Sequence, residues 1–235
     1  MYLVEICCTG NNGRSPMAEV IANKILEENG FEGHIGVIST GTRADPQWDN
    51  VLPYQKVVSI YSKALRSGLV KKAEIDKEKY EHDEEYRKAT QATVRELLGI
   101  MRPIEAALRD AALLDAGLKY QGRRSQTIPR DDVDMLLGME EKHATHAKQI
   151  YAGKAHPPRI GTILKDVSDS GISTDWEYVR TREEFTDFSK ECASFPENIP
   201  DCLGSLSVEP YIEVRKILER ALPIIIQDIE LILFG

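Results

Sequence analysis

One eight-residue stretch near the amino terminus, CTGNNGRS, combines residue types that can attack and hold a phosphoryl group. Cys8 is a nucleophile once its thiol has lost a proton. Arg14 offers a planar fork of N–H donors that matches two phosphate oxygens. Gly10 and Gly13 allow the backbone to curl so that several N–H groups converge on one anion. We therefore interpret residues 8–15 as an anion-binding loop with a nucleophile at its base.

The elements predicted on either side support this interpretation. Residues 2–7 are apolar and β-prone, and they predict a buried strand, whereas a helix is predicted from Pro16 near its first turn to Gly30 at its end. N–H groups at a helix start lack helical partners, and the helix dipole there favours negative charge. This field favours the thiolate form of Cys8, to which the Ser15 hydroxyl can donate a hydrogen bond. The alternative is a buried structural cysteine in an ordinary turn.

The rest of the chain predicts an α/β sheet interrupted by a helical segment. Residues 34–39 and 134–139 are predicted strands, residues 140–151 a short helix, and residues 208–234 a long helix with a kink at Pro223. Strand–helix–strand units of this kind build parallel sheets. Residues 51–116 are charged and helix-prone, and they predict two or three helices broken or kinked at Pro103. Residues 159–200 are expected to form loops with at most one helix.

The loop CTGNNGRSPMAE resembles the signature of the low-molecular-weight protein-tyrosine-phosphatase family, which includes thiol-dependent arsenate reductases and protein-arginine phosphatases. The segments STGT at 39–42, GRRSQTI at 122–128 and VDMLLGMEEKH at 133–143 also resemble family elements. The resemblance implies a flavodoxin-like, doubly wound sheet of four parallel strands. It divides the chain into a phosphatase-like core, residues 1–50 and 117–235, and a helical insertion, residues 51–116, that acts as a cap or dimerisation element.

The resemblance also implies the roles of individual residues. Cys8 corresponds to the nucleophile, Arg14 to the phosphate clamp, and Asn11 to the residue that shapes the loop, while Ser15 and Ser39 support it. The predicted substrate-binding residues are Thr9, Gly10, Asn11, Asn12, Gly13 and Ser15 of the loop, with Trp48 as an aromatic wall for which simple packing is an equal alternative.

Two loop positions depart from the family pattern. The family often has a second cysteine where this chain has Gly13, so one redox partner of Cys8 is missing. The residue after Asn11 helps to separate tyrosine from arginine phosphatases, which tend to have Ile or Thr there, and Asn12 is neither. The substrate class therefore cannot be assigned from this residue.

Cleavage of a phosphate ester also needs an acid to protonate the leaving oxygen. The family supplies it from an Asp-Pro-aromatic loop before the last helix, and the nearest match here is IPDCLGS, which puts Asp201 in register. Glu209 precedes Pro210 and Tyr211 and is the alternative acid, although an acidic residue at a helix start also fits the helix dipole. Asp169 is a third candidate.

The predicted function is a cysteine-dependent phosphatase that hydrolyses phosphate monoesters through a phosphocysteine intermediate. An arsenate reductase is one alternative, and it needs a resolving thiol such as Cys192 or Cys202. A phosphate-binding module with little turnover is another, favoured by the degraded Asp-Pro-aromatic motif. Cys7 should point to the opposite face of its strand. His143 and His146 are interpreted as a solvated helix face rather than metal ligands, and no metal or cofactor is predicted.

Composition limits the partners. Of 235 residues, 38 are Asp or Glu and 30 are Lys or Arg, and this net charge of -8 argues against broad binding to nucleic acid. The sequence shows no apolar run of membrane-spanning length and no signal peptide. Four cysteines without zinc-finger spacing indicate a reducing compartment. We expect a cytoplasmic protein acting on a phosphorylated protein or a small phosphate ester, with a homodimer formed through the insertion as a further expectation.

Overall fold

The computed structural model of the chain describes residues 1–42, 51–72, 74–121, 132–164 and 198–234. Three residues considered above, Trp48, Asp169 and Cys192, lie outside the described residues. Among the helices in these ranges, none has both the length and the apolar character needed to cross a membrane.

Four parallel strands form the sheet, as predicted. They are β1 (Tyr2–Cys8), β2 (Ile35–Gly41), β3 (Met135–Gly138) and β4 (Arg159–Thr162), in the order β2-β1-β3-β4. The expectation that residues 159–200 form loops is wrong for β4. That strand is a four-residue sheet edge with its first residue exposed, and so short a segment shows no alternation of apolar and polar residues.

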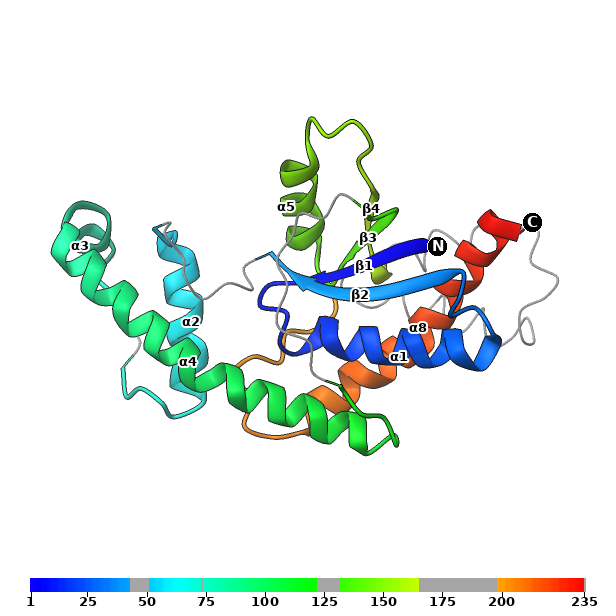
Figure 1. Cartoon of the computed structure of the whole chain (residues 1–235). Helices are drawn as coiled ribbons and strands as arrows, with labels where there is room; N and C mark the ends of the chain where they lie inside the picture. The colour runs from blue at the N-terminus through cyan, green and yellow to red at the C-terminus, as the bar shows by residue number, and fades with distance from the viewer. Residues whose placement is uncertain (43–50, 73, 122–131, 165–197, 235) are drawn as a thin grey trace.

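Helices cover both faces of the sheet (Figure 1). The helices α1 (Arg14–Asn29) and α8 (Glu209–Phe234) pack against each other on one face, and α5 (Glu141–Tyr151) lies on the other. The predicted end of α1 is confirmed, because Gly30 adopts a left-handed conformation with φ of 75° and caps the helix. Pro223 lies inside α8, which continues through it.

Side chains of β1 alternate between the two faces. Val4, Ile6 and Cys8 belong to the main apolar cluster with residues of α1 and α8, while Cys7 packs with Leu136 of β3 and residues of α5. The prediction that Cys7 and Cys8 point to opposite faces is therefore confirmed. Only the Cys8 side chain is directed toward the start of α1.

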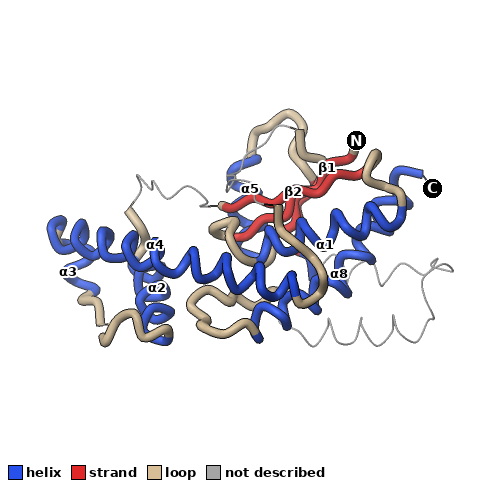
Figure 2. The backbone as a smooth tube through the Cα atoms, turned by 60° about the horizontal axis from the view of Figure 1, so that its bottom comes forward, coloured by secondary structure: helices blue, strands red, loops and turns tan. Residues whose placement is uncertain are grey.

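The middle of the chain forms three helices that extend beyond the carboxyl ends of the strands (Figures 1 and 2). They are α2 (Tyr54–Arg66), α3 (Lys77–His82) and α4 (Glu84–Leu114). A break or kink was predicted at Pro103, and the break does not occur, because α4 runs through it. The residue whose carbonyl a proline ring at this position crowds is the exposed Gly99.

The helix α4 belongs to two apolar clusters. Its first half packs with α2 and α3 in a separate cluster that includes Val57, Ile60 and Leu97. Its last turns contribute Ala112 and Leu113 to the main cluster, against α1 and α8. The long helix therefore holds the α2–α3 unit at a fixed place relative to the carboxyl edge of the sheet.

Candidate active site

The loop between β1 and α1 places Cys8 at the bottom of a cleft. The Cys8 side chain is buried, and the Ser15 Oγ lies 3.0 Å from its Sγ. The same hydroxyl lies 3.0 Å from the Asn11 Oδ1 and 3.0 Å from the carbonyl oxygen of Thr40. A hydroxyl has one proton to donate, so Ser15 can direct it to the sulfur or to either of these oxygens.

Asn11 gives the loop its shape. It is the non-glycine residue with positive φ among the described residues, at 48°, a left-handed conformation that asparagine tolerates better than most residues. Its Nδ2 donates to the Ser39 carbonyl oxygen at 3.1 Å. Gly41 allows this approach, because a Cβ there would lie 2.7 Å from the Asn11 backbone nitrogen. Ser39 thus contacts the loop through its carbonyl, while its hydroxyl donates to Glu19 at 2.5 Å.

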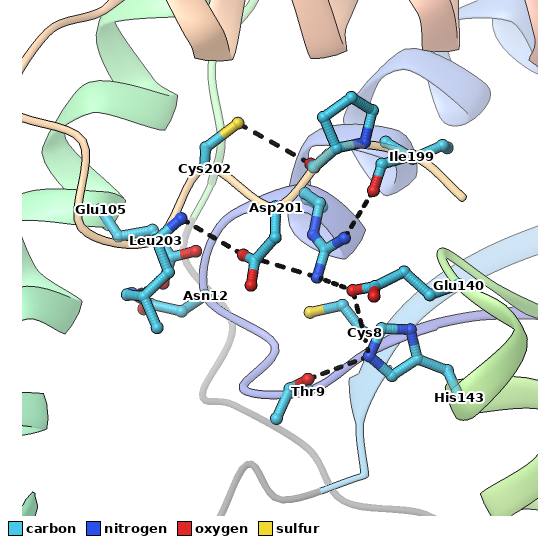
Figure 3. A network of polar contacts seen from close by, with 12 residues as sticks. Cys8, Thr9, Asn12, Glu105, Glu140, His143, Ile199, Asp201, Cys202 and Leu203 are labelled. Carbon is cyan, nitrogen blue, oxygen red and sulfur yellow. Dashed lines mark hydrogen bonds and ion pairs between the residues drawn. The ribbon is translucent and has the colours of Figure 1, made fainter. Parts of the chain in front are cut away.

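Arg14 is buried in the first turn of α1. Two residues from distant segments, Ile199 and Glu140, hold its guanidinium in place, and both are labelled in Figure 3. Its Nη1 donates to the Ile199 carbonyl oxygen at 2.7 Å, and its Nη2 donates to Glu140 Oε1 at 2.7 Å. These bonds use two of the five N–H groups of an arginine. Burial alone would lower the pKa of Arg14, but Asp201, Cys8 and Glu140 together raise it.

Asp201 lies beside this guanidinium and lines the same pocket as Cys8. Its Oδ1 lies 3.6 Å from Arg14 Nη2, and its Oδ2 pairs with Lys63 of α2. Burial favours a higher pKa, yet Arg14 and then Lys63 hold the pKa of Asp201 well below its usual range. Glu209 is exposed in the first turn of α8 and is not among the residues that line the pocket.

His143 is not part of a solvated helix face, so that interpretation is wrong. Its side chain is buried, and its Nε2 lies 2.9 Å from the Thr9 Oγ1 in the loop. Burial lowers the pKa of His143 to about 3, so the ring is neutral. The helix α5 presents this residue to the loop because it starts directly after β3, at the carboxyl edge of the sheet. Within the described ranges, no group of three His, Cys, Asp or Glu side chains could hold a metal ion.

The pocket above Cys8 has one wall made of the loop and another made of α2 and α4. Its volume is about 50 Å³. The second wall, which we call the helical wall, is the set Lys56, Ser59, Ile60, Lys63, Leu98, Arg102 and Glu105. Leu203 and Asp201 complete the lining from the segment before α8.

Three residues of α4 dock directly onto the loop. Asn12 Nδ2 donates to the Arg102 carbonyl oxygen at 2.5 Å and to Glu105 Oε2 at 3.2 Å. Arg109 Nη1 donates to the Asn12 carbonyl oxygen at 2.5 Å. A Cβ on Gly13 would lie 2.4 Å from Glu105 Oε1, so the carboxyl group fills the space that a side chain at position 13 needs. Burial raises the pKa of Glu105, which favours its neutral form.

These contacts explain both departures from the family pattern at the loop. Asn12 is an amide because it binds the backbone and a side chain of α4. At position 13, the Glu105 carboxyl group lies where the Cβ of a second cysteine would stand. The described cysteines Cys7 and Cys202 are buried, and burial raises the pKa of Cys202 to about 12.

Sequence reasoning missed several charged residues that touch the loop or the pocket, among them Glu140, Lys63, Arg102 and Glu105. Glu140 directly follows β3 at the carboxyl edge of the sheet, and this position was a usable signal. Lys63, Arg102 and Glu105 lie in helices whose many charged residues look alike in sequence. Only the packing of those helices shows which of their charges face the pocket.

Comparisons with known proteins found a family profile that matches the segment containing the loop and solved structures that share the fold. The sequence profile of a family described as low molecular weight phosphotyrosine protein phosphatase matches residues 3–93, which include the loop and α2. No curated protein sequence matches significantly. The match confirms the predicted resemblance to this family of hydrolases.

Solved structures share the fold at low sequence identity. A YwlE mutant from Bacillus subtilis is 15% identical, with a TM-score of 0.54, over 98% of this chain and 99% of its own. A low molecular weight protein tyrosine phosphatase from T. tengcongensis is 16% identical, with a TM-score of 0.53, over 97% and 99% of the two chains. A low molecular weight phosphotyrosine phosphatase from Vibrio cholerae O395 is 15% identical, with a TM-score of 0.54, over 98% and 97%.

Proposed function

We propose that this chain, whose residues 3–93 match the low molecular weight phosphotyrosine protein phosphatase family, is a cysteine-dependent phosphatase acting on phosphate monoesters. One observation carries the proposal: the sulfur of Cys8 lies at the bottom of the pocket, 3.0 Å from a serine hydroxyl, at the start of the helix that carries Arg14. A nucleophile, donors for phosphate oxygens and an acidic side chain thus meet in one cleft.

The proposed reaction has two steps. The thiolate of Cys8 attacks phosphorus, an S–P bond forms, and the P–O bond to the leaving group breaks. The loop N–H groups and Arg14 stabilise the equatorial oxygens, and Asp201 gives its proton to the leaving oxygen. Water, deprotonated by the Asp201 carboxylate, then attacks phosphorus and the S–P bond breaks. Inorganic phosphate leaves, and the thiolate of Cys8 is restored.

Asp201 must be protonated to act first as an acid. Arg14 and Lys63 lower its pKa and favour the ionised form. A bound phosphate dianion offsets the positive charge of Arg14, and this raises the pKa of the neighbouring carboxyl group. The change favours Asp201 over Glu209, which lies outside the pocket lining.

Substitution of the nucleophile tests the proposal. Cys8→Ser should reduce hydrolysis of p-nitrophenyl phosphate by a factor of about 10⁴ or more, because an unactivated hydroxyl replaces the thiolate. Binding of phosphate or vanadate, measured by calorimetry, should persist, because backbone N–H groups and Arg14 hold the anion. Cys7→Ala is the matched control, since its side chain points to the other face of the sheet. Full activity of Cys8→Ser would refute the assignment.

Two reagents separate this reaction from its alternatives. Iodoacetate should abolish activity unless phosphate is present, whereas EDTA should leave activity unchanged. A thiol titration after exposure to arsenate addresses the reductase, because a reductase consumes two thiols for each arsenate reduced. Loss of activity with EDTA that a divalent ion restores, or thiol loss with arsenate turnover, would contradict the proposal.

We retain from the sequence three further proposals about the whole protein. The chain divides into a phosphatase core, residues 1–50 and 117–235, and a helical insertion, residues 51–116. The insertion forms a cap or a homodimer surface. The protein acts in the cytoplasm, where a reducing medium keeps a catalytic thiol active.

A further inference from the structure

The helical wall gives the pocket a second region that a phosphate group in the loop does not reach. The leaving group of a bound phosphate ester must extend from the loop toward α2 and α4, because these helices form the other side of the pocket. The chemistry of the helical wall therefore selects the leaving group.

Cationic side chains dominate this wall. Lys56, Lys63 and Arg102 line it, and its apolar side chains are the aliphatic residues Ile60 and Leu98, with Leu203 beside them. Lys63 pairs with Asp201 and so serves the proposed acid. Lys56 and Arg102 lie on the α2 and α4 sides of the pocket. Glu105, the acidic side chain of the wall, accepts a hydrogen bond from Asn12 of the loop.

Arg102 is close to the loop as well as to the open part of the pocket. Its Nε and Nη2 both lie 3.8 Å from the position of a Cβ on Gly10, so the guanidinium packs over the loop. Its backbone is fixed by the bond that its carbonyl oxygen accepts from Asn12. Burial lowers the pKa of Arg102, a cost that an anion bound beside it offsets. A planar guanidinium held in this way suits a carboxylate or phosphate group.

We propose that the helical wall is a leaving-group subsite and that the substrate is a small phosphate monoester whose leaving group carries a second anionic group, bound by Arg102 with Lys56. This inference rests on the proposed phosphatase function and specifies its substrate class. A small substrate fits a nucleophile that is only 4% exposed beneath two helices. The pocket lies between the loop and these two helices, and this position favours a small substrate over a phosphorylated side chain on a folded protein.

A matched pair of substrates tests the second anionic group. Glycerol 3-phosphate and 3-phosphoglycerate have the same length and differ by a hydroxymethyl group in place of a carboxylate. The wild-type kcat/KM should be about tenfold to a hundredfold higher for 3-phosphoglycerate, since a hydrogen bond to a charged group has this effect. p-Nitrophenyl phosphate and a phosphotyrosine peptide complete the panel, and the peptide should be the poorest substrate.

Substitutions then assign the preference to the wall. Arg102→Gln should bring the ratio of the two kcat/KM values close to one, and Arg102→Lys should restore part of it. Lys56→Gln should reduce the ratio of the two kcat/KM values by a smaller factor. This variant is a second, independent test if Arg102→Gln folds poorly. Arg95→Gln is the matched control, because Arg95 is an exposed arginine of the same helix outside the pocket lining and its loss should leave the ratio unchanged.

Binding measurements separate this inference from the proposed function. Calorimetry on the Cys8→Ser variant should show tighter binding of 3-phosphoglycerate than of glycerol 3-phosphate, whether or not the wild type turns either over. Suppose that the protein hydrolyses an aryl phosphate but shows equal kcat/KM values for 3-phosphoglycerate and glycerol 3-phosphate. That result would refute the leaving-group subsite and would not contradict the proposed phosphatase function. A preference that survives in Arg102→Gln, or a phosphopeptide that is the best substrate, would also overturn it.

Discussion

The two sides of the pocket are built in different ways. The loop side consists of residues 8–15, which are consecutive in sequence and are expected to bind phosphate mainly through backbone N–H groups. The helical wall consists of side chains spread from residue 56 to residue 105 on two helices. The loop side therefore suits any phosphate ester, and the helical wall suits particular ones. Changes to the loop should affect all substrates alike, and changes to the wall should affect the choice among them.

Arg14→Lys should have the largest effect. A lysine supplies one point charge and cannot hold the Ile199 carbonyl, Glu140 and two phosphate oxygens at once. We expect kcat/KM to fall by about 10²–10³-fold, equally for glycerol 3-phosphate and 3-phosphoglycerate. Steady-state assays with both substrates measure this, and Arg95→Lys serves as a control. A fall in kcat/KM of less than tenfold, or a fall for one substrate alone, would contradict the proposal that the loop side acts on all substrates alike.

Glu140→Gln should come next. The glutamine keeps an oxygen that can accept a bond from Arg14 but loses the charge that fixes the buried guanidinium. Because a displacement of about 1 Å in a positioning group costs up to about a hundredfold, we expect kcat/KM to fall by about 10–100-fold. The fall should again be uniform across the substrate pair. The neighbouring Glu141→Gln is the control, and an effect as large there would mean that net charge, not the pairing with Arg14, matters.

Gly13→Ala tests the contact where the two sides meet. The new methyl group would lie 2.4 Å from Glu105 Oε1, and we expect a loss of about 1–3 kcal/mol in the free energy of unfolding. The φ of Gly13, −108°, is open to any residue, so the contact is the cause. Glu105→Ala in the same chain should recover part of the loss, as urea unfolding of the two single variants and the double variant will show.

Gly99→Ala is the matched control for that experiment. Among the described residues nothing lies within 4 Å of a Cβ at this exposed helical position, so alanine should be neutral or stabilise the helix. Equal destabilisation by both substitutions, or no recovery in the double variant, would show that Glu105 yields readily and does not determine the residue at position 13.

The pH dependence of stability should show the smallest effect. Burial raises the pKa of Glu105 above its value in the unfolded chain. Its contribution is therefore fully present below about pH 4 and is lost as the pH rises through the folded-state value. Urea unfolding between pH 4 and pH 8 should show this decline in the wild type and not in Glu105→Gln.

Asp201 gives the opposite sign in the same measurement. Arg14 and Lys63 depress its pKa more than partial burial of the side chain raises it, so its contribution is present above about pH 4 and is lost as the pH falls further. Asp201→Asn should remove this acid loss. If both substitutions changed the pH dependence of the unfolding free energy in the same direction, the proposed difference between the two carboxyl groups would be contradicted.

The difference between the two sides also decided what the sequence could predict. The loop was readable because its residues are adjacent and lie between a strand and a helix that each have clear signals. The position of Glu105 opposite Gly13 depends on how α4 packs on α1 and α8, about ninety residues along the chain from the loop. His143 was misread for the same reason, since its helix shows a polar pattern while the loop covers that one ring.

Secondary structure, too, was predicted correctly where the local sequence pattern determines it and missed where packing with distant segments determines it. The strand β1 and the helix α1 have strong patterns, and their predicted ends differ from the structure by at most two residues. The strand β4 was missed because pairing with β3, not its own residues, defines it. Pro103 was expected to break or kink a helix, and α4 is not broken there, because its packing in two apolar clusters outweighs the loss of one hydrogen bond.

The contact between Gly13 and Glu105 has a consequence for how this chain can evolve. Two of the four glycine codons become a cysteine codon by a single base change, so a second loop cysteine lies within short evolutionary reach of a loop glycine. In this chain that mutation would place a side chain against the Glu105 carboxyl group. A substitution that shortens residue 105 makes room for that side chain, and by itself it removes a contact of α4 with Asn12. The two positions are therefore coupled, and a cysteine at position 13 is better tolerated beside a shorter residue 105.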